Sequence, residues 1–265
     1  MAIIALDDPD DSRVADYRNI PDPELIARRG IFVAEGRLVV GRLLTDGRVV
    51  ARSVMVTAAA LNALRPLIAR HPDLPVFVVT QRVMSGIAGF NIHRGCLAIG
   101  ERPARRSWQE VSRDARRLVV LERIGDADNV GSVFRSAAAF GVGAVLLDPA
   151  CTDPLYRKAI RTSMGAALLV PFARIDEWPR ALSDLARTGV AVIALTPSSS
   201  ATCVRDVAQR LSDQRIAVVL GHEGGGLTEG ALAACTHHAR IPIASGVDSI
   251  NVAVAAAIAL YEIAG

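Results

Sequence analysis

Leu118-Val119-Val120-Leu121 is a continuous apolar run, followed by the polar stretch Glu122 to Asp128 and then by Asn129-Val130-Gly131-Ser132-Val133-Phe134-Arg135. Uninterrupted apolar runs of this kind are typical of parallel strands that are covered on both faces. The residues after Asn129 read as the start of a helix, so the stretch predicts a strand, a loop and a helix of an α/β sheet. Ligands of such sheets bind outside the carboxyl ends of the strands. We therefore expect functional side chains between residues 122 and 135.

The same alternation continues to the end of the chain. Further strands are predicted at Ala144 to Leu147, Leu168 to Pro171, Val190 to Leu195, Ile216 to Leu220 and Ala239 to Ile243, with helices between most of them. Two polar or glycine-rich blocks, Gly221 to Leu227 and Ile241 to Ala253, lie at the ends of the last two strands. Ser249 stands where the N-cap of the final helix is expected. Together with the first block, Asn129 to Arg135, three blocks are thus predicted at the ligand-binding edge of one sheet.

The block Gly221-His222-Glu223-Gly224-Gly225-Gly226-Leu227 lets backbone atoms approach a ligand closely, since glycine has no side chain. It lacks the Gly-Lys-Ser/Thr ending of a Walker A loop and the complete context of a dinucleotide-binding loop. A nucleotide-dependent oxidoreductase is therefore disfavoured. Glu223 is the only acidic residue of the block. The alternative to a functional role is that it is an ordinary turn residue.

The N-terminal part has its own α/β pattern. Apolar runs at 31–34, 49–56, 76–79 and 96–99 alternate with helical patterns at 37–44, 58–69 and 81–87, which predicts a small three-layer domain. An arginine-rich stretch with few apolar residues, from Arg102 to Arg117, separates the two patterns and reads as a linker. We place the domain boundary between residues 107 and 108.

Composition limits the classes of function. A chain of 265 residues with 51% hydrophobic residues can bury a sizeable core. Its start has no basic segment before the apolar residues, as a signal peptide would, and the apolar stretch Ile250 to Ala264 is too short to span a bilayer. The four cysteines form no Cys-x-x-Cys pair, so neither a zinc site nor a disulfide framework is indicated, and no metal is expected. These features favour a cytoplasmic protein.

The cations are unusual, because Lys158 is the only lysine and the other basic side chains, histidine apart, are arginines. Arginine binds phosphate with a planar fork, which suits nucleic acid. GC-rich coding is the favoured explanation of this arginine excess, as Ala, Gly and Val are also abundant. His237 and His238 are adjacent, so on a strand they would point to opposite faces and are not expected to share a metal.

Together, the three blocks resemble the signature motifs of the SpoU (TrmH) family of RNA ribose 2'-O-methyltransferases, in the SPOUT superfamily. The resemblance implies a C-terminal parallel-sheet domain with a deep trefoil knot, preceded by a ribosomal-protein-like substrate-binding domain at residues 1–107. In the family the knot forms the pocket for S-adenosylmethionine. By motif matching, that pocket is lined by Leu195, Gly221, Ile241 and Ile250.

The resemblance also assigns a catalytic set, Asn129, Arg135, Glu223, Ser249 and Asn251, in which Glu223 organises the site by bonding to Asn129 or Arg135. Ala253 departs from the family pattern, since a serine is often found there.

RNA contacts are expected from Arg135, from Arg161 in the segment Arg161 to Ala166, and from Arg94. Arg94 follows Phe90 in a glycine-bounded loop, where Phe90 could stack on a base or belong to the core.

The resemblance therefore implies S-adenosylmethionine-dependent methylation of a ribose 2'-hydroxyl in structured RNA, with ribosomal RNA favoured over transfer RNA. Family resemblance further predicts a homodimer. A catalytically inactive RNA-binding protein of the same fold, acting in ribosome assembly, is the alternative. Which nucleotide is modified, and whether the role is housekeeping or antibiotic resistance, stays open.

Overall fold

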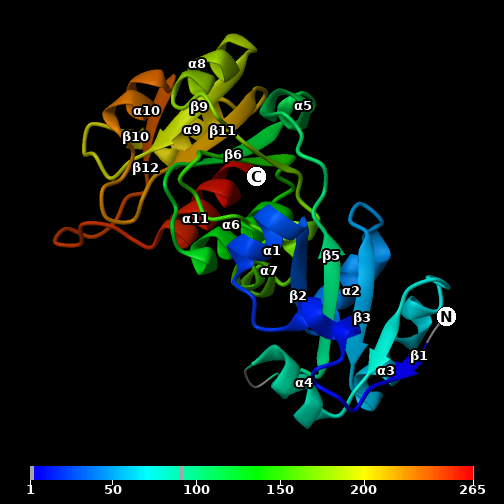
Figure 1. Cartoon of the computed structure of the whole chain (residues 1–265). Coiled ribbons are helices and arrows are strands. Elements are labelled where there is room, and N and C mark those ends of the chain that lie inside the picture. Colours follow the sequence, from blue (N-terminus) through cyan, green and yellow to red (C-terminus); the bar gives the residue numbers. More distant parts are fainter. Residues whose placement is uncertain (1–2, 90–91, 93, 265) are drawn as a thin grey trace. The chain divides into compact units, whose positions relative to one another are not determined.

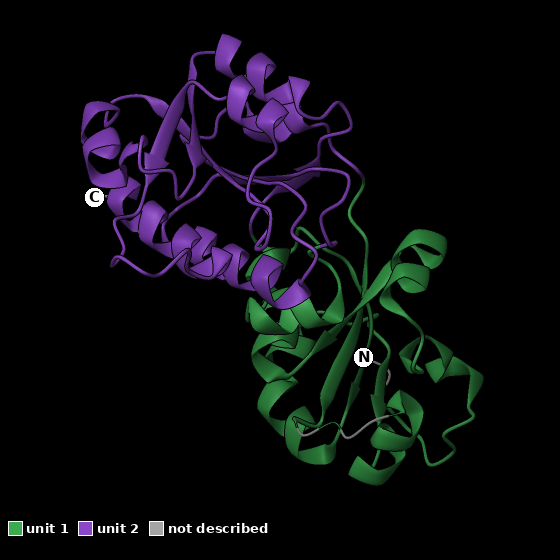
Figure 2. Ribbon diagram, turned by 90° about the vertical axis from the view of Figure 1, so that its left-hand side faces the viewer, with its two compact units in different colours: residues 1–104, 154–169 green, residues 105–153, 170–265 purple. Residues whose placement is uncertain are grey.

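The computed structural model describes residues 3–89, 92 and 94–264. Its chain forms two compact units, coloured separately in Figure 2. Unit 1 comprises residues 1–104 and 154–169, and unit 2 comprises residues 105–153 and 170–265. Residues 154–169, which follow the predicted boundary at residue 107, thus belong with the N-terminal residues.

Unit 1 is built on a mixed five-stranded sheet in the order β1-β4-β3-β5-β2 within the described residues. Its strands are β1 (Ile3–Ala5), β2 (Ile31–Glu35), β3 (Ala51–Val56), β4 (Val76–Val78) and β5 (Cys96–Glu101). Strand β5 runs antiparallel to both β2 and β3, whereas β1, β3 and β4 are parallel. The predicted strands are present. Strand β1 is an additional edge strand, which was not predicted because it has only three residues.

The helices of unit 1 are η1 (Ser12–Tyr17), α1 (Asp22–Arg29), α2 (Arg37–Asp46), α3 (Ala58–Ile68), α4 (Gln81–Ala88), α7 (Arg157–Thr162) and η2 (Ala166–Leu168). Helix α7 packs on β2, and the backbone N–H of Arg157 donates to Asp22 at 2.9 Å. Arg42 on α2 donates to the carbonyl of Met164 at 2.9 Å, while Arg48 donates to that of Leu169. These bonds explain why residues 154–169 are part of this unit.

Unit 2 is built on a parallel sheet in the order β10-β12-β9-β11-β6-β7-β8. Strands β10, β12, β9, β11 and β6 are labelled in Figure 1. Its strands are β6 (Arg117–Leu121), β7 (Ala144–Leu147), β8 (Phe172–Arg174), β9 (Val190–Leu195), β10 (Thr202–Cys203), β11 (Arg215–Leu220) and β12 (His237–Arg240). Its helices are α5 (Trp108–Ser112), α6 (Ala127–Ala139), α8 (Arg180–Arg187), α9 (Val204–Arg210), α10 (Glu229–Ala234) and α11 (Val252–Ala264).

Both faces of this sheet are covered, as the continuous apolar runs predicted. Leu118 and Val120 of β6 share a buried cluster with side chains of α5, α8 and α10. Helix α11 packs against α6, α9 and β11, which accounts for the second layer of helices. The apolar last segment is therefore a packed helix, and no helix among the described residues is long and apolar enough to cross a membrane.

Two predicted strands are misplaced. Residues Ala166–Leu168 form a 3-10 helix, and the strand begins only at Phe172, whose partner on β7 is Val145. Pro171 has no N–H to donate to the ladder, although its carbonyl accepts from Val145 at 2.9 Å. Strand β12 ends at Arg240, because its partner β9 ends at Leu195 and Pro242 follows. Residues 241–251 instead form an exposed loop, which extends away from the strands in Figure 1.

Candidate active site

The carboxyl ends of β12, β9, β11 and β6 lie side by side, because these four strands are neighbours and parallel. The segments that leave them are 241–251, 196–201, 221–227 and 122–126. All three motif blocks therefore begin at one edge of the sheet, as predicted from the strand ends.

Asn129, in the first turn of α6, joins the three blocks. Its side-chain nitrogen donates to Oε1 of Glu223 in the glycine-rich loop. Its side-chain oxygen accepts from Nδ2 of Asn251 at 2.9 Å. A hydrogen-bonded chain Glu223–Asn129–Asn251 thus connects residues that are 94 and 122 positions apart in the sequence. Of the two partners expected for Glu223, the structure shows Asn129.

Asn251 also begins the last helix. Its Oδ1 accepts from the backbone N–H groups of Ala253 at 2.9 Å and Val254 at 3.3 Å, so Asn251 is the N-cap of α11. The prediction of Ser249 as the cap was wrong. Ser249 lies two residues earlier, exposed in the loop, and no hydrogen bond of its side chain is found within the described part of the chain.

The glycine-rich loop is folded back tightly. The N–H of Gly226 donates to the carbonyl of His222 at 2.8 Å, and Nδ1 of His222 accepts from Gly224 at 3.0 Å and Gly225 at 3.3 Å. A Cβ atom on Gly221 would lie 2.4 Å from the backbone of Gly226. Only glycine therefore permits this close approach, and Glu223 is presented to Asn129 by a loop of fixed shape.

Glu122 supports this loop and was not predicted from the sequence. It is fully buried at the end of β6, where its carboxylate accepts from Trp178 Nε1 at 2.6 Å. It also accepts from the hydroxyl and the backbone N–H of Thr228, at 2.7 and 2.9 Å, directly after the glycine-rich loop. A buried carboxylate needs such partners. Its position immediately after an apolar strand was the available signal.

The four residues expected to line the cofactor pocket lie at this same edge. Leu195 ends β9, Gly221 follows β11, Ile241 follows β12 and Ile250 precedes Asn251. All four are half-buried, so apolar side chains and the glycine backbone remain accessible at the strand ends. Apolar contacts combined with accessible backbone groups suit a heteroaromatic ring such as adenine. The chemistry of these residues fits the expected cofactor.

Arg135 lies on the exposed side of α6, and no hydrogen bond or ion pair of its guanidinium is found among the residues the structure describes. It is about 120° around the helix axis from Asn129 and about 9 Å along it. The structure therefore does not bond Arg135 to the Glu223–Asn129–Asn251 chain, but leaves its guanidinium open to a ligand.

The remaining predicted RNA contacts belong to unit 1. Arg161 is exposed on α7, and Arg94 is exposed just before β5, with its Cδ 3.0 Å from where a Cβ of Gly36 would stand. Phe90 lies outside the described residues. Several arginines of the predicted linker have structural partners: Arg105 pairs with Asp176, Arg116 donates to Ser212, and Arg117 donates to the last carbonyls of α11.

Metal ligands are not gathered anywhere in the described ranges, since no group of three or more His, Cys, Asp or Glu side chains could hold an ion there. His237 and His238 have separate partners, the hydroxyl of Thr236 and the carbonyl of Leu232.

The chain is similar in sequence and in structure to known methyltransferases. A model of the SpoU rRNA Methylase family matches residues 116–261. An uncharacterized tRNA/rRNA methyltransferase of Mycobacterium tuberculosis is 40% identical over 259 residues, which cover 96% of this chain and 89% of the relative.

Two solved structures are similar over nearly the whole chain. The AdoMet-bound rRNA methyltransferase from Sinorhizobium meliloti superposes with a TM-score of 0.83 at 22% identity, covering 98% of this chain and 97% of that one. An RNA 2'-O ribose methyltransferase superposes with a TM-score of 0.79 at 25% identity, covering 98% and 97%. The similarity extends over both units and is not confined to the three blocks.

Proposed function

Because the chain belongs to the SpoU rRNA methylase family, we propose that it transfers the methyl group of S-adenosylmethionine to a ribose 2'-hydroxyl of structured RNA, in ribosomal rather than transfer RNA. The observation that carries this proposal is the chain of hydrogen bonds from Glu223 through Asn129 to Asn251, which unites all three motif blocks at the ligand-binding edge of the sheet. The 2'-hydroxyl target is supported by the similar RNA 2'-O ribose methyltransferase structure. The preference for ribosomal RNA rests on the family description.

The cofactor would lie against Leu195, Gly221, Ile241 and Ile250, at the ends of three adjacent strands. When bound, S-adenosylmethionine supplies a methyl carbon on a sulfonium that leaves as a neutral thioether. From the family resemblance we also infer that a trefoil knot shapes this pocket, with residues 241–251, between β12 and α11, as part of it.

Transfer of this methyl group to a hydroxyl requires alignment more than acid–base strength, so positioning supplies much of the rate. Arg135 is the leading catalytic residue. A guanidinium stays charged at physiological pH and binds phosphate bidentately. We therefore assign Arg135 the role of holding the nucleotide in line, and not that of a base. Asn129, Glu223 and Asn251 fix the first turn of the helix that carries it, and Ser249 would complete the set from the exposed loop.

RNA is the partner. Arg94 and Arg161, both exposed on unit 1, would add phosphate contacts that do not depend on sequence. A homodimer is inferred from the family and from apolar side chains exposed on α11. We place the activity in the cytoplasm, which agrees with four free cysteines.

The test is transfer of labelled methyl from S-adenosylmethionine to separated ribosomal and transfer RNA from cells that lack the gene. We expect label in ribosomal RNA. The variant Arg135→Ala should lower the transfer rate by about a hundredfold or more, because alignment is lost, while cofactor binding is retained. Arg210→Ala, which removes an exposed arginine from α9, is the matched control and should transfer normally.

Two results would each contradict one part of the proposal, the role of Arg135 or the activity itself. Near-normal turnover by Arg135→Ala removes that residue from the reaction. Absence of label in both RNA pools, together with measurable binding of S-adenosylmethionine, favours the inactive RNA-binding protein instead.

A further inference from the structure

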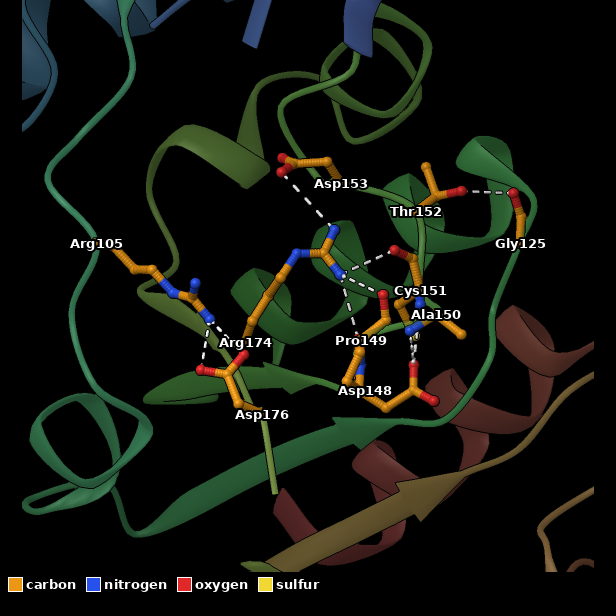
Figure 3. Close-up of polar contacts among 10 residues, drawn as sticks. All are labelled: Arg105, Gly125, Asp148, Pro149, Ala150, Cys151, Thr152, Asp153, Arg174 and Asp176. Carbon is orange, nitrogen blue, oxygen red and sulfur yellow. Dashed lines mark hydrogen bonds and ion pairs between the residues drawn. The ribbon is translucent and has the colours of Figure 1, made fainter. Parts of the chain in front are cut away.

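Arg174, the last residue of β8, holds the loop 148–153 that follows the neighbouring strand β7 (Figure 3). Its Nη1 donates to three carbonyl oxygens of this loop: those of Asp148 at 3.2 Å, Pro149 at 3.4 Å and Cys151 at 3.0 Å. Its Nη2 lies 3.8 Å from the carboxylate of Asp153. The side chain of Arg174 is only 23% exposed, so these contacts are not those of a solvated surface arginine.

The loop is shaped to offer its carbonyls to Arg174. Oδ1 of the buried Asp148 accepts from the N–H groups of Ala150 at 3.1 Å and Cys151 at 2.9 Å, which closes a tight turn. The donors of the turn are thereby bonded internally, and its carbonyls are left for the guanidinium. A guanidinium presents several donors in a fixed plane, whereas a lysine ammonium is a single point charge.

The far side of the same loop is bonded to the segment that leads into α6. Thr152 donates from its N–H to the carbonyl of Ile124 at 2.9 Å and from its hydroxyl to the carbonyl of Gly125 at 2.6 Å. The sulfur of Cys151 accepts from the N–H of Ile124 and donates to the carbonyl of Leu121, both at 3.3 Å. Burial raises the pKa of the Cys151 thiol, which keeps it protonated and able to donate.

Gly125 is directly followed by Asp126, the N-cap of α6. The contacts therefore run without a gap from Arg174, through loop 148–153, to the start of the helix that carries Asn129 and Arg135. We propose that Arg174 is a positioning residue for methyl transfer. By holding loop 148–153 it fixes the segment that leads into α6, and it thereby places Asn129 and Arg135. This inference rests on the proposed function.

Cofactor binding should not depend on Arg174. The residues proposed to line the cofactor pocket follow β9, β11 and β12, whereas β7 and β8 are at the other end of the sheet order. Loss of Arg174 should therefore lower kcat and leave the affinity for S-adenosylmethionine unchanged. A purely structural role would instead reduce the number of folded, cofactor-binding molecules and leave kcat per binding site unchanged.

The test compares Arg174→Ala with Arg180→Ala, in which the lost side chain is exposed on α8 and its nearest carboxylates are 3.9 Å away. Cofactor binding sites are titrated in each preparation, and kcat is expressed per site. We expect Arg174→Ala to lower kcat by about tenfold to a hundredfold, with the Kd for S-adenosylmethionine within about twofold of the original protein, since small misplacements of reacting groups are costly. Arg180→Ala should match the original protein.

Thr152→Val tests the second link without disturbing Arg174, because it removes only the hydroxyl that donates to Gly125. It should lower kcat in the same direction, and it carries the test if Arg174→Ala does not fold. Combined with Arg174→Ala, its effect should be less than multiplicative, since both act through one path.

Amide hydrogen exchange provides a readout that needs no RNA. Exchange of the amides of Asp128 and Val130, which donate to Asp126 at the start of α6, should become faster in Arg174→Ala and stay unchanged in Arg180→Ala. Unchanged exchange there, or an unchanged kcat per binding site, would overturn the role of Arg174. If the original protein methylates no RNA, the proposed function fails, and the exchange measurement still decides whether Arg174 holds the entry of α6.

Discussion

A primary amide can hold both ends of the hydrogen-bonded chain at the site, because it donates and accepts at once. Asn129 donates to a carboxylate and accepts from another amide at the same time. An aspartate could not donate to Glu223, and a serine would be too short to bridge both partners. The role of each asparagine can therefore be separated by changing which of its atoms can donate.

Asn251→Asp should separate helix capping from the organisation of the site. An aspartate retains the oxygen that accepts from Ala253 and Val254, and it is as good an N-cap as asparagine. It cannot donate to Asn129, and turning the Asn129 amide over would only move the unfavourable contact to Glu223. We expect a free energy of unfolding within about 1 kcal/mol of the original and methyl transfer at least about tenfold slower. Urea unfolding and initial rates measure the two effects.

Asn251→Ala is the companion variant, because it loses both functions. Its free energy of unfolding should be about 1 kcal/mol lower than that of Asn251→Asp, because the cap is lost as well, and its methyl transfer should also be slowed. Full activity of Asn251→Asp would show that its bond to Asn129 is dispensable.

Gly221→Ala and Gly225→Ala are a matched pair within one loop. A methyl group on Gly221 meets the backbone of Gly226 and Leu227 at 2.4 Å, whereas on Gly225 it meets nothing within 4 Å. We expect Gly221→Ala to displace the glycine-rich loop and to weaken S-adenosylmethionine binding by about tenfold or more, about 1.4 kcal/mol. Gly225→Ala should bind normally. Calorimetric titration compares them, and equal affinities would mean that the fold of this loop does not shape the pocket.

At the scale of elements, the sequence predicted strands wherever an apolar run met a clear end. Leu118 to Leu121, Val190 to Leu195 and Ile216 to Leu220 are central strands of the sheet, covered on both faces, so hydrophobicity alone identifies them. The strand predicted at 168–171 failed because β8 is an edge strand of three residues, and the apolar residues before it are buried in a 3-10 helix of unit 1. Apolarity indicates burial but does not say in which element or unit.

The candidate site was predictable to the same degree. Residues within the motif blocks could be named from resemblance, and the bond between Asn129 and Glu223 followed from that expectation. The partners of Glu122 and Arg174 could not be identified, because they are distant in sequence and are mostly backbone groups or residues outside the motifs. The position of Glu122 directly after an apolar strand was its one signal. The cap at Asn251 was missed because two residues with capping side chains stand two positions apart, and only the loop's path decides between them.

The attachment of α11 to α9 provides a prediction about pH. Arg205 donates from Nε to Oε2 of Glu262 at 3.1 Å and from Nη2 to Oε1 at 3.0 Å, and this hydrogen bonding lowers the pKa of Glu262. The pKa is lower in the folded state than in the unfolded one, so the stabilisation is present above the unfolded value, about 4.3, and is lost as the pH falls through the folded one.

A double-mutant cycle with Arg205→Ala and Glu262→Gln should therefore give a favourable coupling free energy at about pH 7 that declines below about pH 4. Urea unfolding across this range measures it. A coupling that stays constant with pH would contradict the ionic nature of the contact.

At the scale of the whole molecule, two separate segments of the chain belong to unit 1. The residues between Pro154 and Leu169 leave the sheet of unit 2 after β7, pack in unit 1 and return to form β8. Ala159 and Ile160 of α7 are fully buried there. Unit 1 is therefore not a simple N-terminal module, and a deletion of residues 1–107 would leave this segment without its packing partners. Substitution of Arg94 and Arg161 in the full chain isolates RNA binding more cleanly.

The exposed apolar side chains of the C-terminal region favour self-association. Val254 is 50% exposed and Tyr261 is 66% exposed, and their spacing of seven residues places them on one face of α11. Val247 and Ile243, in the loop before the helix, are also exposed. Exposed apolar side chains that share one face of a helix are typical of interfaces, and a second copy of the chain is the partner that family resemblance predicts.

We expect sedimentation velocity at micromolar concentration to show a dimer, and Val254→Asp to shift it to monomer, because the interface would bury an unpaired charge. Leu38→Asp is the matched control, since Leu38 is 47% exposed on α2 of unit 1 and should not affect the dimer. A monomeric original protein would contradict the dimer, and equal behaviour of the two variants would place the interface elsewhere than on α11. If Val254→Asp is a folded monomer that still binds S-adenosylmethionine but no longer binds or methylates RNA, the RNA contacts are shared between subunits.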